Sequence, residues 1–352
     1  MSDAKSLILA LPHPTILVGQ DERIIGINEP AKQLVGMDCE GMPYITALRQ
    51  PALLDAVEAT LKDHAARTTT YLGNDGVQGT TFEVSVRCAE VSSGLAVVLS
   101  YQDLTALEQA EDMRRDFVAN VSHEMRTPLT SLQGFIETLR GPAKNDPAAI
   151  ERFLGIMDQE AGRMHRLVED LLSLSRVESD VRVRPTTEVH LQRLVNEVLA
   201  ALTPVAAAKT VTLVPELPEE DIEIVGDREQ LWQVFSNLIE NAIKYGVEGG
   251  EVKISMTGPE HERAIMRDGV QITVRDNGIG IPSHAIARLT ERFYRVDSHR
   301  SREVGGTGLG LAIVKHIINR HRGRLRISSV IGEGSEFKVI LPVERRPASQ
   351  QS

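Results

Sequence analysis

The spacing of hydrophobic and polar positions divides the 352-residue chain into three parts. In the first part, short apolar runs between Gly- and Asn-containing turns predict strands at 15–19, 24–28, 68–73, 81–91 and 94–103. Helical spacing predicts two helices between these strands, at 29–36 and 51–63, the second opening with Pro51, a favoured first helical residue. This order predicts a small α+β domain with an antiparallel sheet at residues 1–102.

From Asp103 the apolar spacing becomes helical and stays so to about Leu139. The segment 141–147 breaks the pattern, and a second helix follows at 147–179. Each helix carries one apolar stripe, which a two-helix hairpin cannot bury by itself. We therefore expect residues 103–182 to pair with a second copy as a dimeric four-helix bundle. Packing of the hairpin against another domain of the same chain is the alternative.

Helices and strands alternate after an expected linker at 180–187. Helical patterns cover 188–208, 226–246 and 309–323, and strand patterns cover 210–217, 251–258, 270–278, 324–330 and 335–343. Asp227 is the expected N-cap of the middle helix, with Gln230 at the capping-box position. We predict an α/β sandwich at 187–345, so that the whole chain is multidomain α+β, and a disordered tail at 346–352.

Composition narrows the classes of protein that fit this pattern. A net charge of −10 argues against nucleic acid as the main partner. The two cysteines, Cys39 and Cys88, form no disulfide framework and lack metal-ligand spacing. No apolar run approaches the ~20 residues of a membrane-spanning helix, and the N-terminus lacks a signal-peptide pattern. We therefore expect a soluble, cytoplasmic chain without a membrane segment.

The segment 117–132, FVANVSHEMRTPLTSL, gathers His123, Glu124, Thr127 and Pro128 on one helix. Neutral imidazole is a nucleophile near neutral pH, and an adjacent carboxylate can fix its tautomer and accept a proton. Thr127 lies about one turn from His123, where its hydroxyl can position a water. Pro128 predicts a local kink. Taken alone, a His–Glu pair on a helix is most often a solvated surface pair.

A second polar group lies on the helix predicted at 226–246. Asn237, Asn241, Lys244 and Tyr245 fall at i, i+4, i+7 and i+8, on one helix face. An amide oxygen can ligate Mg²⁺, a lysine can offset phosphate charge, and a tyrosine can pack on a base or ribose. Asn and Lys are also common on any solvent-exposed helix face, so a nucleotide site cannot be predicted from this group without further motifs elsewhere in the chain.

Two glycine-rich stretches supply those motifs. In DNGIGIP at 276–282, Asp276 can accept a hydrogen bond from the exocyclic amine of adenine, while Gly278 and Gly280 allow close approach of the backbone. VGGTGLGLAIVKHI at 304–317 clusters glycines before a helix, an arrangement that favours phosphate although its spacing is not that of a P-loop. The three stretches in this order predict a nucleotide site.

In these motifs the chain resembles the sensor histidine kinases of two-component signalling. SHEMRTPL is similar to the phosphoacceptor box, NLIENAIKY to the asparagine box, RFYRVD to the phenylalanine box, and DNGIGI and GGTGLGL to two glycine boxes. The resemblance runs from about 103 to 343. The first domain is similar to PAS domains. The last domain resembles the ATP-binding fold shared with gyrase, the ninety-kilodalton heat-shock chaperone and mismatch-repair ATPases.

The resemblance implies a role for each matching residue. His123 matches the phosphorylated histidine, Glu124 the acid implicated in proton transfer, and Thr127 the residue linked to dephosphorylation of the partner. ATP and Mg²⁺ would be bound, with Asn241 as the metal ligand, by Asn237, Asn241, Lys244, Tyr245, Asp276, Gly278, Gly280, Gly306, Thr307, Gly308, Leu309 and Gly310. Arg300 and Arg302, in an expected lid at 297–305, could reach phosphate, and the alternative that we favour is that they are solvated charges.

The implied function is ATP-dependent autophosphorylation of a homodimer on His123, then transfer to an aspartate of a response regulator, with a reverse phosphatase activity. Segments such as GFIETLRG resemble the phosphate-regulon sensor kinases, a group that usually carries N-terminal membrane helices. One alternative is a scaffold that binds a regulator but phosphorylates nothing. The other is an ATPase, disfavoured because Asn237 stands where hydrolysing relatives carry a glutamate base.

Overall fold

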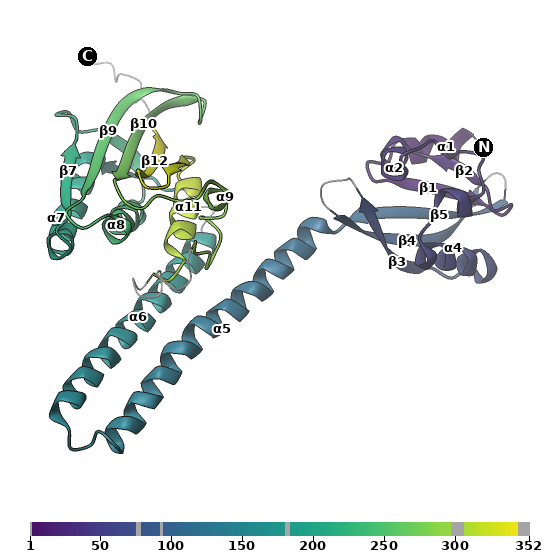
Figure 1. The fold of residues 1–352 in the computed structure, drawn as a ribbon. Coiled ribbons are helices and arrows are strands. Elements are labelled where there is room, and N and C mark those ends of the chain that lie inside the picture. Colours follow the sequence, from purple (N-terminus) through teal and green to yellow (C-terminus); the bar gives the residue numbers. More distant parts are fainter. Residues whose placement is uncertain (1, 75–78, 92–93, 180–183, 297–305, 344–352) are drawn as a thin grey trace, which may run out of the picture. The chain divides into compact units, whose positions relative to one another are not determined.

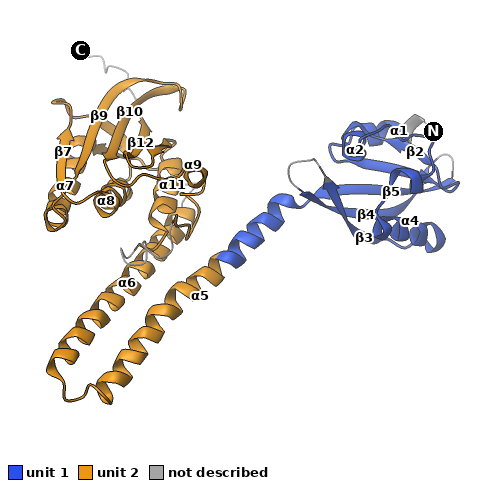
Figure 2. Cartoon of the chain, in the orientation of Figure 1, with its two compact units in different colours: residues 1–116 blue, residues 117–352 orange. Residues whose placement is uncertain are grey.

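The computed structural model describes residues 2–74, 79–91, 94–179, 184–296 and 306–343. The chain forms two compact units, residues 1–116 and 117–352, and the division falls inside one helix, α5 (Thr105–Arg140) (Figure 2). The expected lid at 297–305, with Arg300 and Arg302, and the expected tail at 346–352 lie outside the described residues.

The first unit is built on a five-stranded antiparallel sheet in the order β2-β1-β5-β4-β3 (Figure 1). Its strands are β1 (Thr15–Gly19), β2 (Ile24–Ile27), β3 (Arg67–Asn74), β4 (Gly79–Val91) and β5 (Gly94–Asp103). Its helices are α1 (Ser2–Leu9), α2 (Glu29–Val35), α3 (Tyr44–Ala47) and α4 (Pro51–Asp63). The five predicted strands and both predicted helices are confirmed, and α1 and α3 are additional to them.

Strand β1 is buried along its whole length because helices cover both faces of the sheet. Ile16 and Val18 belong to a core with Leu53 of α4, whereas Leu17 belongs to a second cluster with Ile8 of α1. Successive side chains of a strand point to opposite faces. The unbroken apolar run TILVG is therefore the pattern of a strand that is covered on both sides.

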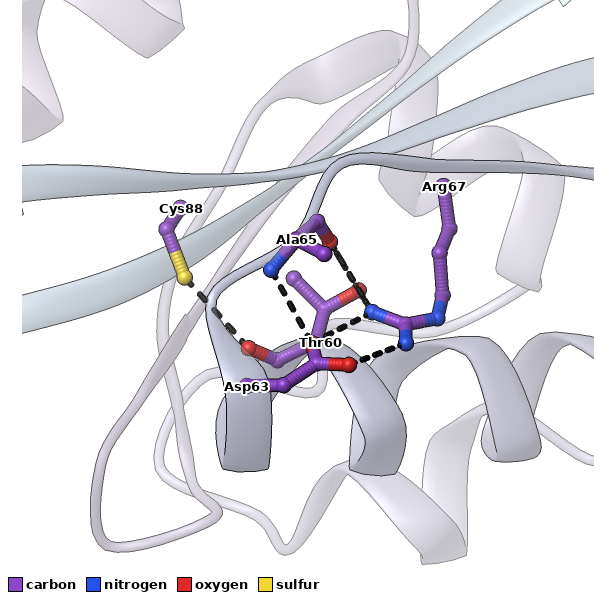
Figure 3. A network of polar contacts seen from close by, with 5 residues as sticks. All are labelled: Thr60, Asp63, Ala65, Arg67 and Cys88. Atoms are coloured by element: carbon purple, nitrogen blue, oxygen red, sulfur yellow. Dashed lines mark hydrogen bonds and ion pairs between the residues drawn. The ribbon is translucent and has the colours of Figure 1, made fainter.

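The end of α4 is tied to β3 by Arg67 (Figure 3). The Arg67 guanidinium lies 2.7 Å from Asp63 Oδ1 and donates to the Ala65 carbonyl at 3.0 Å and to Thr60 Oγ1 at 3.3 Å. This contact with Arg67 holds the pKa of the Asp63 carboxyl well below its usual range. Cys88 Sγ donates to the Thr60 carbonyl at 3.5 Å. Thr60 therefore links the Cys88 thiol and the Arg67 guanidinium in one structural network.

Helices α5 and α6 (Pro147–Ser179) form the predicted hairpin (Figure 1). Asp146 caps α6, since its Oδ1 accepts from the Ala148 and Ala149 N–H groups at 3.1 and 3.0 Å. The rings of Phe135 and Phe153 stack across the hairpin at 5.3 Å. Helix α5 continues through Pro128, so the predicted kink does not interrupt it.

The apolar stripes of the hairpin are divided between two surroundings. Leu167, Leu174 and Val177 of α6 are buried in the core of the last part of the chain, which agrees with the alternative of packing against another domain. Other large apolar side chains of α5 and α6 are exposed in the single chain, namely Leu107, Met113, Val118, Leu129, Ile136, Leu154, Val168 and Leu172. These exposed residues are the ones available for a second copy.

The last part of the chain is a mixed five-stranded sheet in the order β11-β12-β10-β9-β7, in which only β7 and β9 are parallel among the described strands. The strands are β7 (Thr212–Glu216), β9 (Glu251–Glu262), β10 (Arg267–Asp276), β11 (Arg324–Val330) and β12 (Gly334–Pro342). Helices pack on it: α7 (Leu191–Ala208), α8 (Arg228–Tyr245), the short α9 (Ser283–Ile286) and α11 (Gly310–Arg320) (Figure 1). The predicted α/β sandwich is confirmed.

One predicted boundary is wrong. Residues 188–190 do not begin a helix but belong to β6 (Thr187–His190), which pairs with β8 (Glu223–Gly226). The strand β8 had no prediction, because EIVG is too short a run to stand out. The predicted helix begins only at Leu191, after this strand pair.

The N-terminus of α8 is capped differently from the prediction. Asp227 Oδ1 accepts from the Gln230 N–H at 3.2 Å, as expected of an N-cap. The Asp227 N–H, however, donates to Nε2 of the buried His321 at 2.9 Å. Gln230 Oε1 is buried and has no hydrogen-bond partner within the described part of the chain. The reciprocal half of the capping box is therefore replaced by a histidine from the end of α11.

Candidate functional site

A cavity of about 550 Å³ opens between α8, the end of β10, the turn before α11 and helix α6. Ten of the twelve predicted nucleotide-site residues line it: Asn237, Asn241, Lys244, Tyr245, Asp276, Gly280, Gly306, Thr307, Gly308 and Gly310. The other two do not line it. Gly278 and Leu309 lie behind the surface, and the Leu309 side chain is fully buried in the core.

The polar face of α8 forms one wall of the cavity because its opposite face is buried. Leu231, Val234, Phe235, Leu238 and Ile239 are all fully buried in the core. This packing turns Asn237, Asn241 and Lys244 toward the cavity. Lys244 Nζ lies 3.0 Å from Glu240 Oε2, one turn earlier. Asn237 Nδ2 is buried and lacks a hydrogen-bond partner among the residues described, so the cavity offers polar capacity that the protein itself leaves unused.

Asp276 lies at the other end of the cavity, where β10 ends. It is only 6% exposed, and burial raises the pKa of its carboxyl. Its Oδ1 accepts from the N–H groups of Gly278 at 2.8 Å and Ser335 at 3.2 Å. Oδ2 is therefore the oxygen left for a ligand. Apolar side chains, including Ile279, Ile281, Ile331 and Phe337, line this region, which suits a flat base with one hydrogen-bond donor.

Two glycines of this region are required by backbone geometry. Gly280 has φ +71°, and a Cβ there would lie 2.1 Å from the Val330 carbonyl oxygen. A Cβ on Gly278 would lie 2.4 Å from the Tyr245 carbonyl oxygen. Gly278 therefore serves the site by letting β10 and α8 approach, although it does not line the cavity.

The turn before α11 presents backbone and a hydroxyl to the cavity. Gly308 has φ +75°, and its carbonyl accepts from the Phe293 N–H at 2.9 Å. The Thr307 hydroxyl faces the cavity and accepts from the Leu309 N–H at 3.3 Å. The turn leads directly into α11, and Gly310 and Leu311 at the helix start line the cavity. The first N–H groups of a helix have no partner within it, which favours an anion at this place.

The predicted phosphoacceptor residues lie outside the cavity. His123 is exposed on α5 and is not part of the cavity wall. Glu124 accepts from Arg163 Nη2 of α6 at 3.0 Å and lies 4.0 Å from Arg295 Nη1. The Thr127 hydroxyl donates to the His123 carbonyl at 3.2 Å, a common helical arrangement that points it away from a water-positioning role.

Several residues of the cavity have no counterpart in the sequence prediction. Glu240 and Arg295 line it from α8 and from the segment after α9, and Arg166, Glu169 and Asp170 line it from α6. Glu240 and Arg295 lie inside the asparagine and phenylalanine boxes, so motif reasoning could have found them. The α6 residues carry no local signal, since only the packing of α6 brings them here.

Two features are absent from the described residues. No described helix is both long enough and apolar enough to cross a bilayer. Over the same residues, no cluster of three or more His, Cys, Asp or Glu side chains is arranged to hold a metal ion.

Comparison with known proteins agrees with this arrangement. Residues 113–180 match the model of the His Kinase A (phospho-acceptor) domain, and residues 226–345 match that of the histidine kinase-, DNA gyrase B- and HSP90-like ATPase. The solved structure of histidine kinase ThkA in complex with response regulator protein TrrA has a similar fold, with a TM-score of 0.53 and 23% identity over 96% of this chain and 98% of that one.

Curated relatives extend the match to nearly the whole chain. Sensor protein kinase WalK of Staphylococcus aureus is 34% identical over 345 residues, which cover 96% of this chain and 80% of that protein. Phosphate regulon sensor protein PhoR of Pseudomonas aeruginosa is 42% identical over 236 residues, covering 67% of this chain and 52% of that protein. The chain spans about half the length of several of these relatives. With both domain models in this order and a relative matched along most of its length, the chain belongs to the sensor histidine kinases of two-component systems.

Proposed function

We propose that the protein binds ATP in the 550 Å³ cavity, transfers the γ-phosphoryl group to His123 and passes it to an aspartate of a response regulator. The observation that carries this proposal is the convergence of Asn241, Lys244, Asp276 and the glycine turn on one cavity. The buried carboxylate and apolar residues at one end suit adenine, and the lysine and helix start at the other suit phosphates.

Mg²⁺ fits the oxygen donors at the phosphate end. The amides of Asn237 and Asn241 and the carboxylate of Glu240 are hard ligands of the kind that this ion takes. The unpartnered Nδ2 of Asn237 is a hydrogen-bond donor, so it suits a phosphate oxygen beside the ion. We assign Asn241 as the ligand and Lys244 as the phosphate contact. When bound, Mg²⁺ would neutralise charge that develops on the transferred phosphoryl group.

Transfer to His123 requires a different placement of the cavity relative to α5. His123 does not line the cavity in this arrangement, so the ATP-binding part of the same chain or of its dimer partner must take another position to reach it. Glu124 is the candidate to accept the proton of the attacking imidazole, held by Arg163 at 3.0 Å. In-line positioning would supply most of the catalysis, as for phosphoryl transfer generally.

The exposed apolar residues of α5 and α6 support a homodimer built as a four-helix bundle. The same bundle would receive the response regulator, and the similar kinase ThkA has been solved in complex with such a protein, TrrA. The likeness to PhoR makes a phosphate-regulon regulator the first candidate partner.

A phosphatase activity would need the Thr127 hydroxyl to leave the His123 carbonyl and orient a water. Phosphate release from a phosphorylated regulator, measured with and without the protein, tests it.

Labelling with γ-phosphate-tagged ATP tests the kinase reaction. We expect the wild-type chain to become labelled and His123→Ala to remain unlabelled while binding ATP normally, because His123 does not line the cavity. A labelled His123→Ala chain would refute the assignment.

The two alternatives give different results in the same experiment. An unlabelled wild-type chain would favour the scaffold. Phosphate release that outruns labelling and survives loss of His123 would favour an ATPase.

A further inference from the structure

Helix α6 closes one side of the nucleotide cavity. Arg166, Glu169 and Asp170, spaced at i, i+3 and i+4, all line it. The helix is held there by the burial of Leu167 and Leu174 against α11 and its surroundings. The cavity is therefore bounded partly by the phosphoacceptor hairpin itself.

Ser173 adds a polar contact outside the cavity. Its Oγ donates to Gln233 Oε1 of α8 at 2.7 Å. Neither residue lines the cavity. This contact holds α6 against the ATP-binding part without touching the space that a nucleotide would fill.

Asp170 makes a polar contact between α6 and the glycine turn. The Thr307 hydroxyl donates to Asp170 Oδ2 at 2.6 Å. Hydrogen bonds to a carboxylate are stronger than those between neutral groups. Because the hydroxyl has a single proton, Thr307 cannot donate to a phosphate oxygen while it donates to Asp170.

The charges around Asp170 are those that a phosphate would meet. Burial raises the pKa of the Asp170 carboxyl, while the Thr307 hydroxyl and the Lys244 ammonium favour its charged form. Asp170 thus contacts the hydroxyl, and shares the cavity lining with the cation, that the proposed function assigns to the phosphate end. Glu169 and Glu240 add further negative charge to the same cavity wall.

The geometry points to Asp170 as an internal competitor for the phosphates of the nucleotide. This inference rests on the proposed function, since it requires phosphates at Thr307 and Lys244. With α6 in place, the Asp170 carboxylate occupies the Thr307 hydroxyl and repels a triphosphate. Nucleotide binding and α6 docking therefore oppose each other, and each weakens the other by the same factor. ATP would in this way release the ATP-binding part from α6, as transfer to His123 requires.

The test uses the full chain and the Mg²⁺ complex of a non-hydrolysable ATP analogue, with Kd measured by calorimetry. Asp170→Asn keeps the shape of the side chain and removes its charge. Asp158→Asn is the matched control, because it makes the same change at an exposed position of α6 that does not line the cavity. We expect Asp170→Asn to lower Kd about fivefold and Asp158→Asn to leave it within about twofold, since exposed charges are well screened.

A gain in affinity cannot be produced by misfolding, so the expected result is specific. If Asp170→Asn leaves Kd unchanged or raises it, or if both variants lower it equally, this inference is overturned while the proposed function stands. If no chain binds the analogue, the proposed function fails and the inference with it. Should Asp170→Asn not fold, Ser173→Ala replaces it. Loosening α6 at Ser173 should also lower Kd, and an unchanged Kd would count against the competition.

Discussion

Asp276 illustrates how the surroundings of one residue decide its chemistry. Both of these backbone hydrogen bonds go to Oδ1, which leaves Oδ2 as the oxygen available to a ligand. In an asparagine held by the same two bonds, the free position would carry an NH₂ group. The NH₂ group of that asparagine would face the exocyclic amine of adenine, and both groups are hydrogen-bond donors, so no hydrogen bond could form. The specificity of the base site thus depends on the two backbone contacts as much as on the carboxylate.

Asp276→Asn should therefore weaken ATP binding by at least about tenfold. It should leave the fold at neutral pH as stable as the wild type or more stable, because burial disfavours the charged carboxylate. Calorimetric Kd and thermal unfolding measure the two effects. Loss of binding together with a lower melting temperature would show that the residue is needed for the fold instead.

The pH dependence of ATP binding follows from the same residue. Burial raises the pKa of Asp276, so its proton returns at a higher pH than for an ordinary aspartate. Since the base needs an acceptor, affinity should fall as pH is lowered through this raised pKa. The stability of the fold depends on pH in the opposite direction from ATP affinity. The protonated form is favoured in the fold, so Asp276 destabilises the fold as pH rises through the raised pKa.

At the scale of elements, α6 has two kinds of surface. Leu167, Leu174 and Val177 are buried against the ATP-binding part, whereas Leu154 and Leu172 are exposed. Helix α5 likewise exposes Leu129 and Ile136, which lie seven residues apart on one face. A single hairpin leaves this face in water, and a second copy would cover it.

Ile136→Glu should convert the dimer into a monomer, because a charge would be buried without a partner in the bundle. Light scattering after gel filtration measures the mass, expected to fall from about twice the chain mass of 38.7 kDa to that value. Thr130→Glu is the control, since it adds the same charge at an exposed position about 120° around the helix. A dimer that survives Ile136→Glu and dissociates with Thr130→Glu would place the interface on another face.

At the scale of the whole chain, the two compact units have separate cores. The first surrounds Leu53, Val84 and Leu99, and the second surrounds Phe235, Ile254 and Ile313. The N-terminal core contains none of the cavity residues. Each unit is therefore expected to unfold as its own cooperative transition, and a ligand should stabilise only the unit that binds it.

Leu53→Ala should lower the stability of the N-terminal unit by about 2–5 kcal/mol, since this fully buried side chain leaves a cavity. Calorimetry should show one transition moving down with this change and the other moving up with ATP. Leu72→Ala, at a leucine of the same unit that is 64% exposed, should move neither. A single transition that responds to both ATP and Leu53→Ala would contradict the independence of the units.

Local pattern was enough to predict most elements and most of the nucleotide site. Helix 51–63 and strands 81–91 and 94–103 follow from spacing and turn residues, which act over a few positions. The sequence also predicted the cavity residues Asn237, Asn241, Lys244 and Asp276, because motifs keep chemically active residues close together in the chain. The short elements β8 and α1 were missed. Strand β8 has only four residues, and α1 is a weakly amphipathic helix at the chain end, so neither shows a clear hydrophobic period.

Packing decided the contacts between distant residues. The chain order contains no sign that Asp170 meets Thr307, that Arg163 holds Glu124, or that His321 caps Asp227. Each contact joins residues 39 or more positions apart, and each depends on how whole helices dock. Short sequence motifs thus determine the chemistry of the site, because single residues supply that chemistry. Access to the site is set by the fold, because α6 reaches the cavity only through the burial of Leu167 and Leu174.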